Sequence, residues 1–221
     1  MSLTQRLGKK GLFPKLSDIK MSGPGLYRLL ERPWIYGLSQ RLIAFGGEPI
    51  TPLVQQMLAQ MPPARRVLDI GCGPSSYLWR AGLDPIGLDL SFDYVKSFNR
   101  QGRFAVTGSA IELPFGDNTI DGVWSIGLLH HLTDDMVQLA VNQMVKVCRV
   151  GGYIVIFDGV LPEYPWKHPL AHVLRKKDRG RFMRTQSDLE YFLLPREDWV
   201  CKRIQYSPLG LEGLFCTLLK K

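Results

Sequence analysis

Between residues 65 and 158, short apolar runs alternate with amphipathic segments, and this alternation restricts the possible folds more than any other feature of the chain. Strands that are separated by helices normally pair in parallel, because each helix carries the chain back across the sheet. Runs such as "YIVIF" at 153–157 are apolar throughout, as expected for strands buried on both faces. The sequence therefore predicts a mostly parallel α/β sheet with helices on both faces. The predicted strands are 66–70, 85–89, 103–107, 120–126 and 152–158, and the predicted helices are 75–81, 92–99 and 133–147.

A glycine-containing turn follows the first of these strands, in "VLDIGCGPSS" at 67–76. Gly71 and Gly73 allow the backbone to turn sharply and to approach a ligand without an intervening Cβ. The next strand ends at Asp89, where a carboxylate can accept hydrogen bonds from both hydroxyls of a ribose. This pattern indicates a cofactor that contains a nucleoside. The alternative is purely structural: a tight strand-to-helix turn in which Asp69 caps the helix.

The third glycine of a dinucleotide-binding loop is replaced here by Ser76, which argues against a dinucleotide cofactor. Four ordered segments within 65–158 instead resemble the class I S-adenosylmethionine-dependent methyltransferases. They are most similar to the small methyltransferases (methyltransferase type 11) that include the ubiquinone and menaquinone biosynthesis enzymes. The resemblance implies a Rossmann-like fold with a seven-stranded, mostly parallel sheet and an antiparallel C-terminal strand pair. The four segments are "VLDIGCGPSS", "IGLDLS", "ELPFGDNTIDGVWSIGLLHHL" and "CRVGGYIVIFD".

The resemblance also implies S-adenosyl-L-methionine as the cofactor and a role for each part of the loop. Asp69 is expected to orient the methionine end of the cofactor, while the Gly71 to Gly73 turn passes beneath it and Asp89 holds the ribose. In this family an acid usually precedes "LPF" and contacts the adenine amino group, but Ser109 occupies its place here. Adenine recognition is therefore expected to depend on nearby backbone groups and apolar contacts. The predicted cofactor-binding residues are Asp69, Gly71, Cys72, Gly73, Asp89, Leu90, Ser109, Ala110, Ile111 and Ser125, and no metal ligand is predicted.

The N-terminal part of the chain differs from this cofactor-binding core. Residues 1–23 carry several lysines and no sustained apolar run, which is typical of a basic, partly disordered arm. Apolar residues recur near a period of 3.6 in residues 24–60. This segment is predicted to form a helical lid over the cofactor, and residues 24–221 are predicted to form one methyltransferase domain.

The C-terminal part is expected to complete the site and the sheet. Residues 159–195 follow the last parallel strand and are predicted to be an insertion on the acceptor side, with a helix at 187–194 capped by Ser187. Residues 196–221 contain two strand-like runs with no helix between them. They are predicted to form an antiparallel pair at the edge of the sheet.

The net charge of +8 implies a surface that attracts phosphates, nucleic acid or anionic lipid, and a dense basic run lies at 174–184. The apolar runs are far shorter than the roughly 20 residues that a membrane-spanning helix needs. The cysteines form no CxxC pair, so reduced, mostly buried thiols and a cytoplasmic location are expected. Peripheral contact with an anionic membrane through the basic segments stays open. The cysteines are Cys72, Cys148, Cys201 and Cys216.

Residues that follow the fourth and fifth predicted strands are the candidates for the methyl acceptor site, because ligands bind outside the carboxyl ends of such strands. His130 or His131 is the predicted general base, with a role in the pocket wall as an equal alternative. Asp158 is expected either to meet the acceptor or to cap the loop. Tyr164 and the nearby Trp166 are interpreted as an apolar wall or as core. Three arginines of the basic run are predicted to bind an anionic group of the substrate or to form a solvated face: Arg179, Arg181 and Arg184.

The leading hypothesis is methyl transfer from S-adenosylmethionine to a small-molecule or lipid-like acceptor that carries an anionic group. A nucleic-acid (RNA) methyltransferase is the first alternative, since the chain is basic. Against it, the sequence lacks the motif of amino-methylating nucleic-acid enzymes, which is Asn or Asp followed by Pro-Pro and an aromatic residue. A regulatory subunit that binds the cofactor without turnover is the second alternative.

Overall fold

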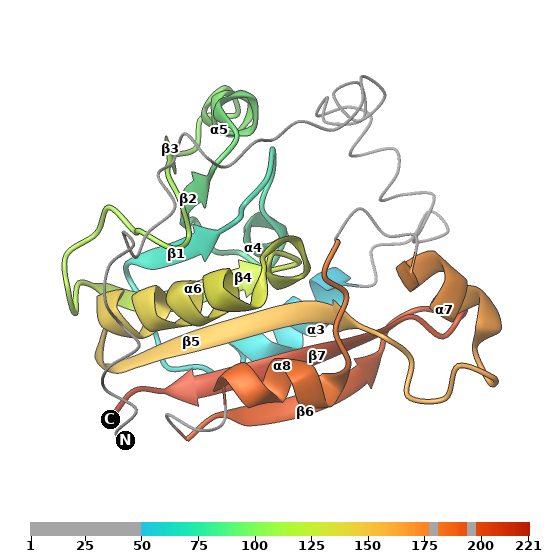
Figure 1. Cartoon of the computed structure of the whole chain (residues 1–221). Coiled ribbons are helices and arrows are strands. Elements are labelled where there is room, and N and C mark those ends of the chain that lie inside the picture. The colour runs from blue at the N-terminus through green and yellow to red at the C-terminus, as the bar shows by residue number, and fades with distance from the viewer. Residues whose placement is uncertain (1–49, 177–180, 194–197) are drawn as a thin grey trace, which may run out of the picture.

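The computed structural model describes residues 50–176, 181–193 and 198–221, which are coloured in Figure 1. The predicted arm at 1–23 and most of the predicted lid at 24–60 lie outside these ranges. The described end of the lid segment is helix α3 (Ile50–Leu58), which buries Val54. No helix in the described ranges is both long and apolar enough to cross a membrane.

The described strands form one seven-stranded sheet in the order β3-β2-β1-β4-β5-β7-β6. Strands β1 to β5 pair in parallel, and β7 pairs antiparallel with both β5 and β6. This arrangement confirms the predicted α/β fold with its antiparallel C-terminal pair. Because the parallel strands run the same way, their carboxyl ends meet at one end of the sheet. The strands are β1 (Val67–Ile70), β2 (Ile86–Asp89), β3 (Ala105–Thr107), β4 (Ile120–Ile126), β5 (Cys148–Val160), β6 (Val200–Gln205) and β7 (Glu212–Leu219).

Helices cover both faces of the sheet, with α6 and α8 on one face and α3 and α4 on the other (Figure 1). Strand residues alternate between the two cores. In β5, Ile154 and Ile156 join the core on the α6 side, whereas Val155 and Phe157 join the core on the α3 side. Both faces of β5 are therefore apolar, which explains the uninterrupted apolar run. The other helices are α4 (Tyr77–Arg80), α5 (Phe92–Asn99), α6 (Asp134–Val147), α7 (Pro169–Lys176) and α8 (Gln186–Leu193), with a 3₁₀ turn, η3 (Leu129–His131).

The predicted cap of α8 was wrong. The helix begins at Gln186, and Thr185 caps it: the amide of Asp188 donates to Thr185 Oγ1 at 3.2 Å, and the amide of Thr185 donates to the Asp188 carboxylate at 3.1 Å. This reciprocal pair is a capping box. Ser187 lies inside the first turn of the helix instead. The sequence "TQSD" contains three residues that could cap a helix, and the backbone conformation decides which of them does so.

The expectation that all four cysteines are reduced was also wrong. Cys201 on β6 and Cys216 on β7 form a disulfide, because the antiparallel register places them directly opposite each other with a Cα–Cα distance of 4.1 Å. Cys72 and Cys148 are buried free thiols, as expected. The disulfide removes two of the four thiols on which the expected reducing compartment rested.

Candidate active site

The glycine turn between β1 and α4 has the conformation that the sequence predicts. Gly71 and Gly73 have left-handed φ angles of 74° and 62°, which favour glycine. The amides of Gly71 and Cys72 both donate to the carbonyl of Leu88 on β2, at 2.7 and 3.1 Å. A Cβ at Gly71 would lie 3.0 Å from Leu128, whereas nothing lies within 4 Å of a Cβ at Gly73. The turn is therefore anchored to β2, and its Gly73 side leaves space for a ligand.

Asp69 is a buried carboxylate at the end of β1. Its Oδ2 accepts a hydrogen bond of 2.5 Å from Ser76 Oγ, which in turn accepts one from the amide of Leu78 at the start of α4. Burial raises the pKa of Asp69 to about 7, the bond from Ser76 opposes this shift, and the charge of Asp89 adds to it. A cationic group beside Asp69 would therefore stabilise the ionised form of this buried carboxylate.

Replacing Asp69 with asparagine is expected to stabilise the cofactor-free protein above neutral pH. Asp69 has a higher pKa in the folded chain than the 3.8 that is usual for an exposed aspartate. The folded state therefore loses stability relative to the unfolded state as pH rises from about 4 to 7. Asparagine has no such charge, so urea denaturation at about pH 8 is expected to show a gain of roughly 2–4 kcal/mol in the free energy of unfolding.

The control for this prediction is Asp93→Asn, which removes an exposed carboxylate from the first turn of α5. The gain from Asp69→Asn is expected to shrink toward zero as the pH falls to about 4. A gain that is the same at every pH would contradict the prediction.

Asp89 links the glycine turn to the end of β2. Its Oδ2 accepts from the amide of Gly73 at 3.0 Å, and its Oδ1 accepts from the amide of Ser91 at 2.8 Å. Burial raises the pKa of Asp89 in spite of these bonds. Each carboxylate oxygen keeps further lone pairs, so Asp89 can hold the turn and still accept a hydrogen bond from a ligand.

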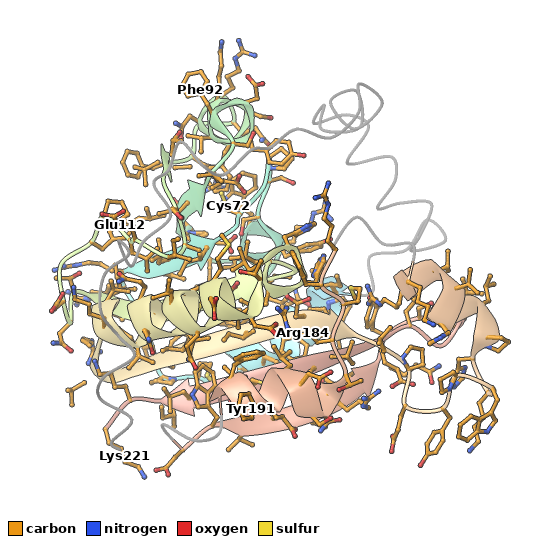
Figure 2. The ribbon with its side chains drawn as sticks, viewed as in Figure 1. Cys72, Phe92, Glu112, Arg184, Tyr191 and Lys221 are labelled. Carbon is orange, nitrogen blue, oxygen red and sulfur yellow. A yellow bond between two sulfur atoms is a disulfide. The ribbon has the colours of Figure 1, made fainter. Side chains whose placement is uncertain are left out.

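The thiol of the predicted cofactor residue Cys72 is buried beside the turn and donates to the carbonyl of Gly73 at 3.5 Å. Its thiol packs in a small core with Val95 and Phe98 of α5, and it lies 2.8 Å from the position that a Cβ of Gly87 would take (Figure 2). Burial also raises the pKa of the Cys72 thiol. In this position only the backbone of Cys72 is available to a ligand at the turn.

The residues predicted to surround adenine follow β2 and β3. Leu90 directly follows Asp89 and is exposed, whereas Ser109 is buried and its Oγ accepts from the amide of Ile111 at 3.4 Å. The hydroxyl that replaces the usual acid is thus hydrogen-bonded within its own loop. Ala110 and Ile111 are partly buried against the core on the α6 side. This stretch offers apolar surface and backbone groups.

Ser125 lies on β4 with its side chain on the α6 face, because it shares strand parity with Val123, which belongs to that core. Asp69 shares strand parity with Val67, which belongs to the core of the opposite face. The Ser125 hydroxyl is buried and has no hydrogen-bond partner among the described residues. Ser125 and Asp69 therefore belong to opposite faces of the sheet.

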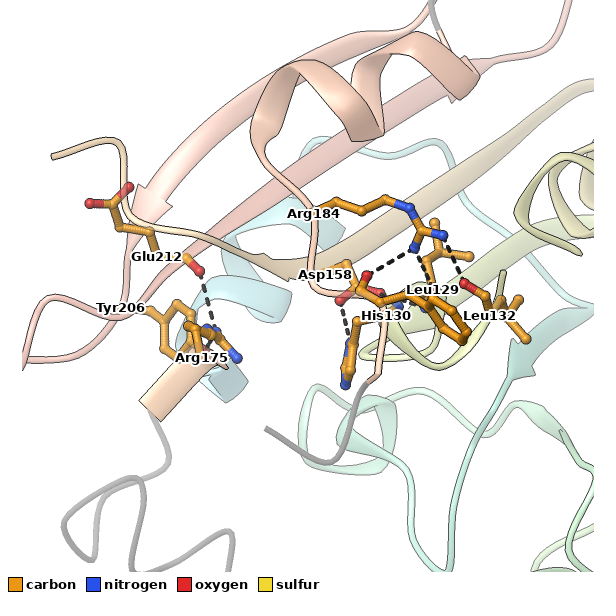
Figure 3. Close-up of polar contacts among 9 residues, drawn as sticks. Leu129, His130, Leu132, Asp158, Arg175, Arg184, Tyr206 and Glu212 are labelled. Carbon is orange, nitrogen blue, oxygen red and sulfur yellow. Dashed lines mark hydrogen bonds and ion pairs between the residues drawn. The ribbon is translucent and has the colours of Figure 1, made fainter. Parts of the chain in front are cut away.

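His130 and Asp158 form a pair at the carboxyl ends of β4 and β5 (Figure 3). His130 Nδ1 lies 2.5 Å from Asp158 Oδ1, while Asp158 Oδ2 accepts from the amides of Leu129 at 2.5 Å and of His130 at 3.2 Å. Burial would raise the pKa of Asp158, but the charge and hydrogen bond of His130 outweigh it, and His131 and the Leu129 amide add to the lowering. Asp158 therefore caps the loop after β4, as one of its two interpretations predicts, and it also pairs with a histidine.

The contact with Asp158 gives a neutral His130 a defined tautomer and ring orientation. An ionised carboxylate at Nδ1 keeps the proton of a neutral imidazole on that nitrogen, so the lone pair lies on Nε2 of His130. The ring of His131 lies beside that of His130, with 4.2 Å between ring centroids. Leu128 lies against the Gly71 turn. It precedes His130 by only two residues, so His130 lies close to the predicted cofactor site.

Arg184 points into the protein rather than toward solvent (Figures 2 and 3). Its guanidinium donates to the carbonyls of Leu129 and Leu132 at 2.8 and 2.7 Å and to the carboxylate of Asp134 at 2.6 Å. The amide of Phe182 also donates to the carbonyl of His130 at 3.1 Å. Arg184 therefore fixes the backbone that carries His130, and its donors are engaged inside the protein.

Arg184→Met is expected to lower the free energy of unfolding by about 2–4 kcal/mol, because the buried carbonyls of Leu129 and Leu132 lose their donor. Amide hydrogen exchange in η3 is expected to become faster than in α6. The matched control is Arg181→Met, since Arg181 is exposed. Equal effects of the two substitutions would contradict the positioning role of Arg184.

The remaining predicted acceptor residues are not gathered at one point. Tyr164 and Trp166 are exposed, so the interpretation of these aromatics as core was wrong. Arg181 is exposed as well, and Arg179 lies outside the described residues. The sequence did not predict two contacts at the turn: the hydrogen bond from Ser76 to Asp69, and the packing of Leu128 against Gly71. A serine at the start of a helix is a recognisable cap, but no local signal points to Leu128.

The chain resembles known proteins over its central part. Residues 68–156 match a family model described as a methyltransferase domain. The tRNA (carboxymethyluridine(34)-5-O)-methyltransferase of Arabidopsis thaliana is 34% identical over 110 residues, which is 48% of this chain and 26% of the plant protein. A demethylmenaquinone methyltransferase of Roseiflexus castenholzii is 32% identical over 117 residues, 49% of this chain and 48% of that enzyme. The chain thus spans from a quarter to a half of the length of these relatives.

Solved structures agree in fold. A methyltransferase of Thermotoga maritima, described as a possible histamine N-methyltransferase, superposes with a TM-score of 0.66 at 16% identity and covers 88% of this chain and 100% of its own. The strand order, the antiparallel C-terminal pair and the glycine turn are those of the class I S-adenosylmethionine-dependent methyltransferases. The chain has the fold of this class, and its residues 68–156 belong to the methyltransferase-domain family.

Proposed function

We propose that the chain transfers a methyl group from S-adenosylmethionine to an oxygen atom of a small-molecule or lipid-like acceptor. The observation that carries this proposal is the His130–Asp158 pair, in which a buried carboxylate holds a histidine at the carboxyl ends of β4 and β5. A base is useful for a hydroxyl acceptor, because the attacking oxygen must lose its proton.

The residues at the turn fit the cofactor of this class. Asp69 offers a buried carboxylate to the cationic amino group of the methionine end, and Asp89 offers carboxylate lone pairs to the ribose. The open side of Gly73 leaves room for close approach. When bound, S-adenosylmethionine supplies a methyl group on a sulfonium, whose sulfur leaves with the bonding electron pair.

The residues of the chain then have two tasks. His130 Nε2 accepts the proton of the acceptor hydroxyl, and Asp158 stabilises the resulting imidazolium through Nδ1. The fold aligns the two reactants, which by itself contributes about 7–11 kcal/mol to such reactions. Exposed Arg181 supports an acceptor with an anionic group, whereas Arg184 acts through the backbone of η3.

A tRNA acceptor is the second candidate. It is favoured by the net charge of +8 and by the relative from Arabidopsis thaliana that is named as a tRNA methyltransferase. A relative named as a demethylmenaquinone methyltransferase favours a small-molecule acceptor instead. Phosphate contacts would make tRNA binding weaken steeply as salt is added.

The test uses the full chain and S-adenosylmethionine labelled on its methyl group. Label is to be followed into total tRNA and into a panel of phenols, quinols, amines and lipid extracts. Transfer to a hydroxyl acceptor that is lost in His130→Ala supports the first candidate, and label in tRNA supports the second. Calorimetric binding of S-adenosylhomocysteine without any labelled product would overturn both and favour a regulatory subunit.

A further inference from the structure

Helix α7 and the turn before it expose an unusual amount of apolar surface. Trp166 is 73% exposed and Leu170 is 52% exposed, while Ala171 and Arg175 form the buried side of the helix. Leu170 and Val173 lie three positions apart and so share the outer side of α7. We name the exposed apolar residues of this segment the α7 surface: Tyr164, Trp166, Leu170 and Val173.

Basic side chains border the α7 surface. Lys167 Nζ lies over the ring of Tyr164, 4.6 Å from its centroid, and the rings of Tyr164 and Trp166 pack edge to face at 5.4 Å. Lys176 at the end of α7 is exposed. From 159 to 176 the sequence contains a single acidic residue, Glu163. The surface thus combines an aromatic and aliphatic centre with cations at its rim.

The α7 surface lies on the side of the molecule where the acceptor would enter. α7 follows the carboxyl end of β5, and Figure 1 shows it beyond that end of the strand. The chain returns from α7 to Phe182, whose amide donates to the carbonyl of His130, and Phe182 is itself exposed. The backbone that carries the proposed base is thus tied to Phe182, which follows α7 in the chain.

We infer that the α7 surface docks on a bilayer that contains anionic phospholipid. Leu170 and Val173 have no polar group and no π face, so they gain from insertion among acyl chains and gain little against phosphates or bases. Tryptophan and tyrosine favour the level of the lipid headgroups, and lysines reach the phosphates from there. The inference deepens the proposed function, since a lipid-like acceptor would then reach the site from the membrane.

The experiment is flotation of the full chain with vesicles of phosphatidylcholine, with and without phosphatidylglycerol. The test variant is Trp166→Ala with Leu170→Gln. The matched control is Tyr191→Ala with Leu219→Gln, because Tyr191 on α8 is also 73% exposed and Leu219 on β7 is also 52% exposed (Figure 2). Far-UV circular dichroism and thermal unfolding verify that each variant folds, and Val173→Gln serves as a second, milder probe.

We expect binding to the anionic vesicles that weakens about tenfold or more in the test variant, since two side chains that would insert among the acyl chains lose their apolar surface. The control is expected to bind like the unaltered chain. Equal binding of the test variant and the control would overturn the inference, as would loss of tRNA binding in the test variant with vesicle binding unchanged. Flotation needs neither cofactor nor acceptor, so the two proposals can fail separately. Methyl transfer without vesicle binding refutes this inference alone. Vesicle binding without methyl transfer refutes only the proposed function.

Discussion

Alanine in place of His130 is expected to lower kcat for a hydroxyl acceptor by about 10²- to 10⁴-fold, the usual contribution of a positioned general base. The affinity for S-adenosylhomocysteine is expected to stay unchanged, because the His130 side chain pairs with Asp158 rather than with Asp69 or Asp89. Single-turnover transfer and calorimetry measure the two quantities separately.

Asp158→Asn tests the orientation of the base. The asparagine oxygen can still accept from the amides of Leu129 and His130, but its amide would donate to Nδ1 of His130. The imidazole proton then moves to Nε2, where no lone pair remains to accept the acceptor proton. We expect a loss of kcat similar to that of His130→Ala, with the fold retained.

His131→Ala is the matched control, since His131 is the next residue and its ring lies 4.2 Å from that of His130 between centroids. A small effect there, with a large one at His130, supports the assignment of the base. If His131→Ala abolished transfer while His130→Ala did not, the roles of the two histidines would be reversed from those proposed here.

Asp89→Ala is expected to weaken binding of S-adenosylhomocysteine by at least about 100-fold. Two hydrogen bonds from ribose hydroxyls to a carboxylate are worth about 1.5–3 kcal/mol each, and each 1.4 kcal/mol is tenfold in affinity. The substitution also releases the amides of Gly73 and Ser91, which loosens the turn that carries the cofactor. Isothermal titration calorimetry measures the affinity, and thermal unfolding shows that the fold persists.

Asp93→Ala is the control for this change, because Asp93 is an exposed carboxylate four residues further along the chain. Its removal alters the net charge equally without touching the glycine turn. Unchanged affinity in Asp89→Ala would refute the placement of the ribose at this residue.

The parallel part of the sheet and the cofactor turn were predictable because their signals are local. The five predicted parallel strands all form, and the predicted helix 92–99 is α5 without a shift of either end. The turn at Gly71 and Gly73 lies within one continuous motif. The cap of α8 was predicted wrongly because Thr185 and Ser187 can both act as an N-cap, and nothing in the local sequence favours one over the other.

The interactions between distant segments were not predictable in the same way. Arg184 belongs to a basic run, and a charge run usually forms a solvated face, yet this guanidinium is buried against carbonyls more than fifty residues away. One of the two interpretations of Trp166 was a core residue, yet its side chain is exposed. Whether a side chain points inward depends on how its segment crosses the sheet.

The sequence by itself determined the class of fold and the glycine turn at which we propose that the cofactor binds, because strand and helix periodicity and the glycine motif act over a few consecutive residues. Only the tertiary structure decided that His130 meets Asp158 and that Cys201 meets Cys216. These pairs form where strands adjacent in space, but separated in the chain, align in a particular register. Register depends on the packing of the whole sheet, which no short stretch of the chain encodes.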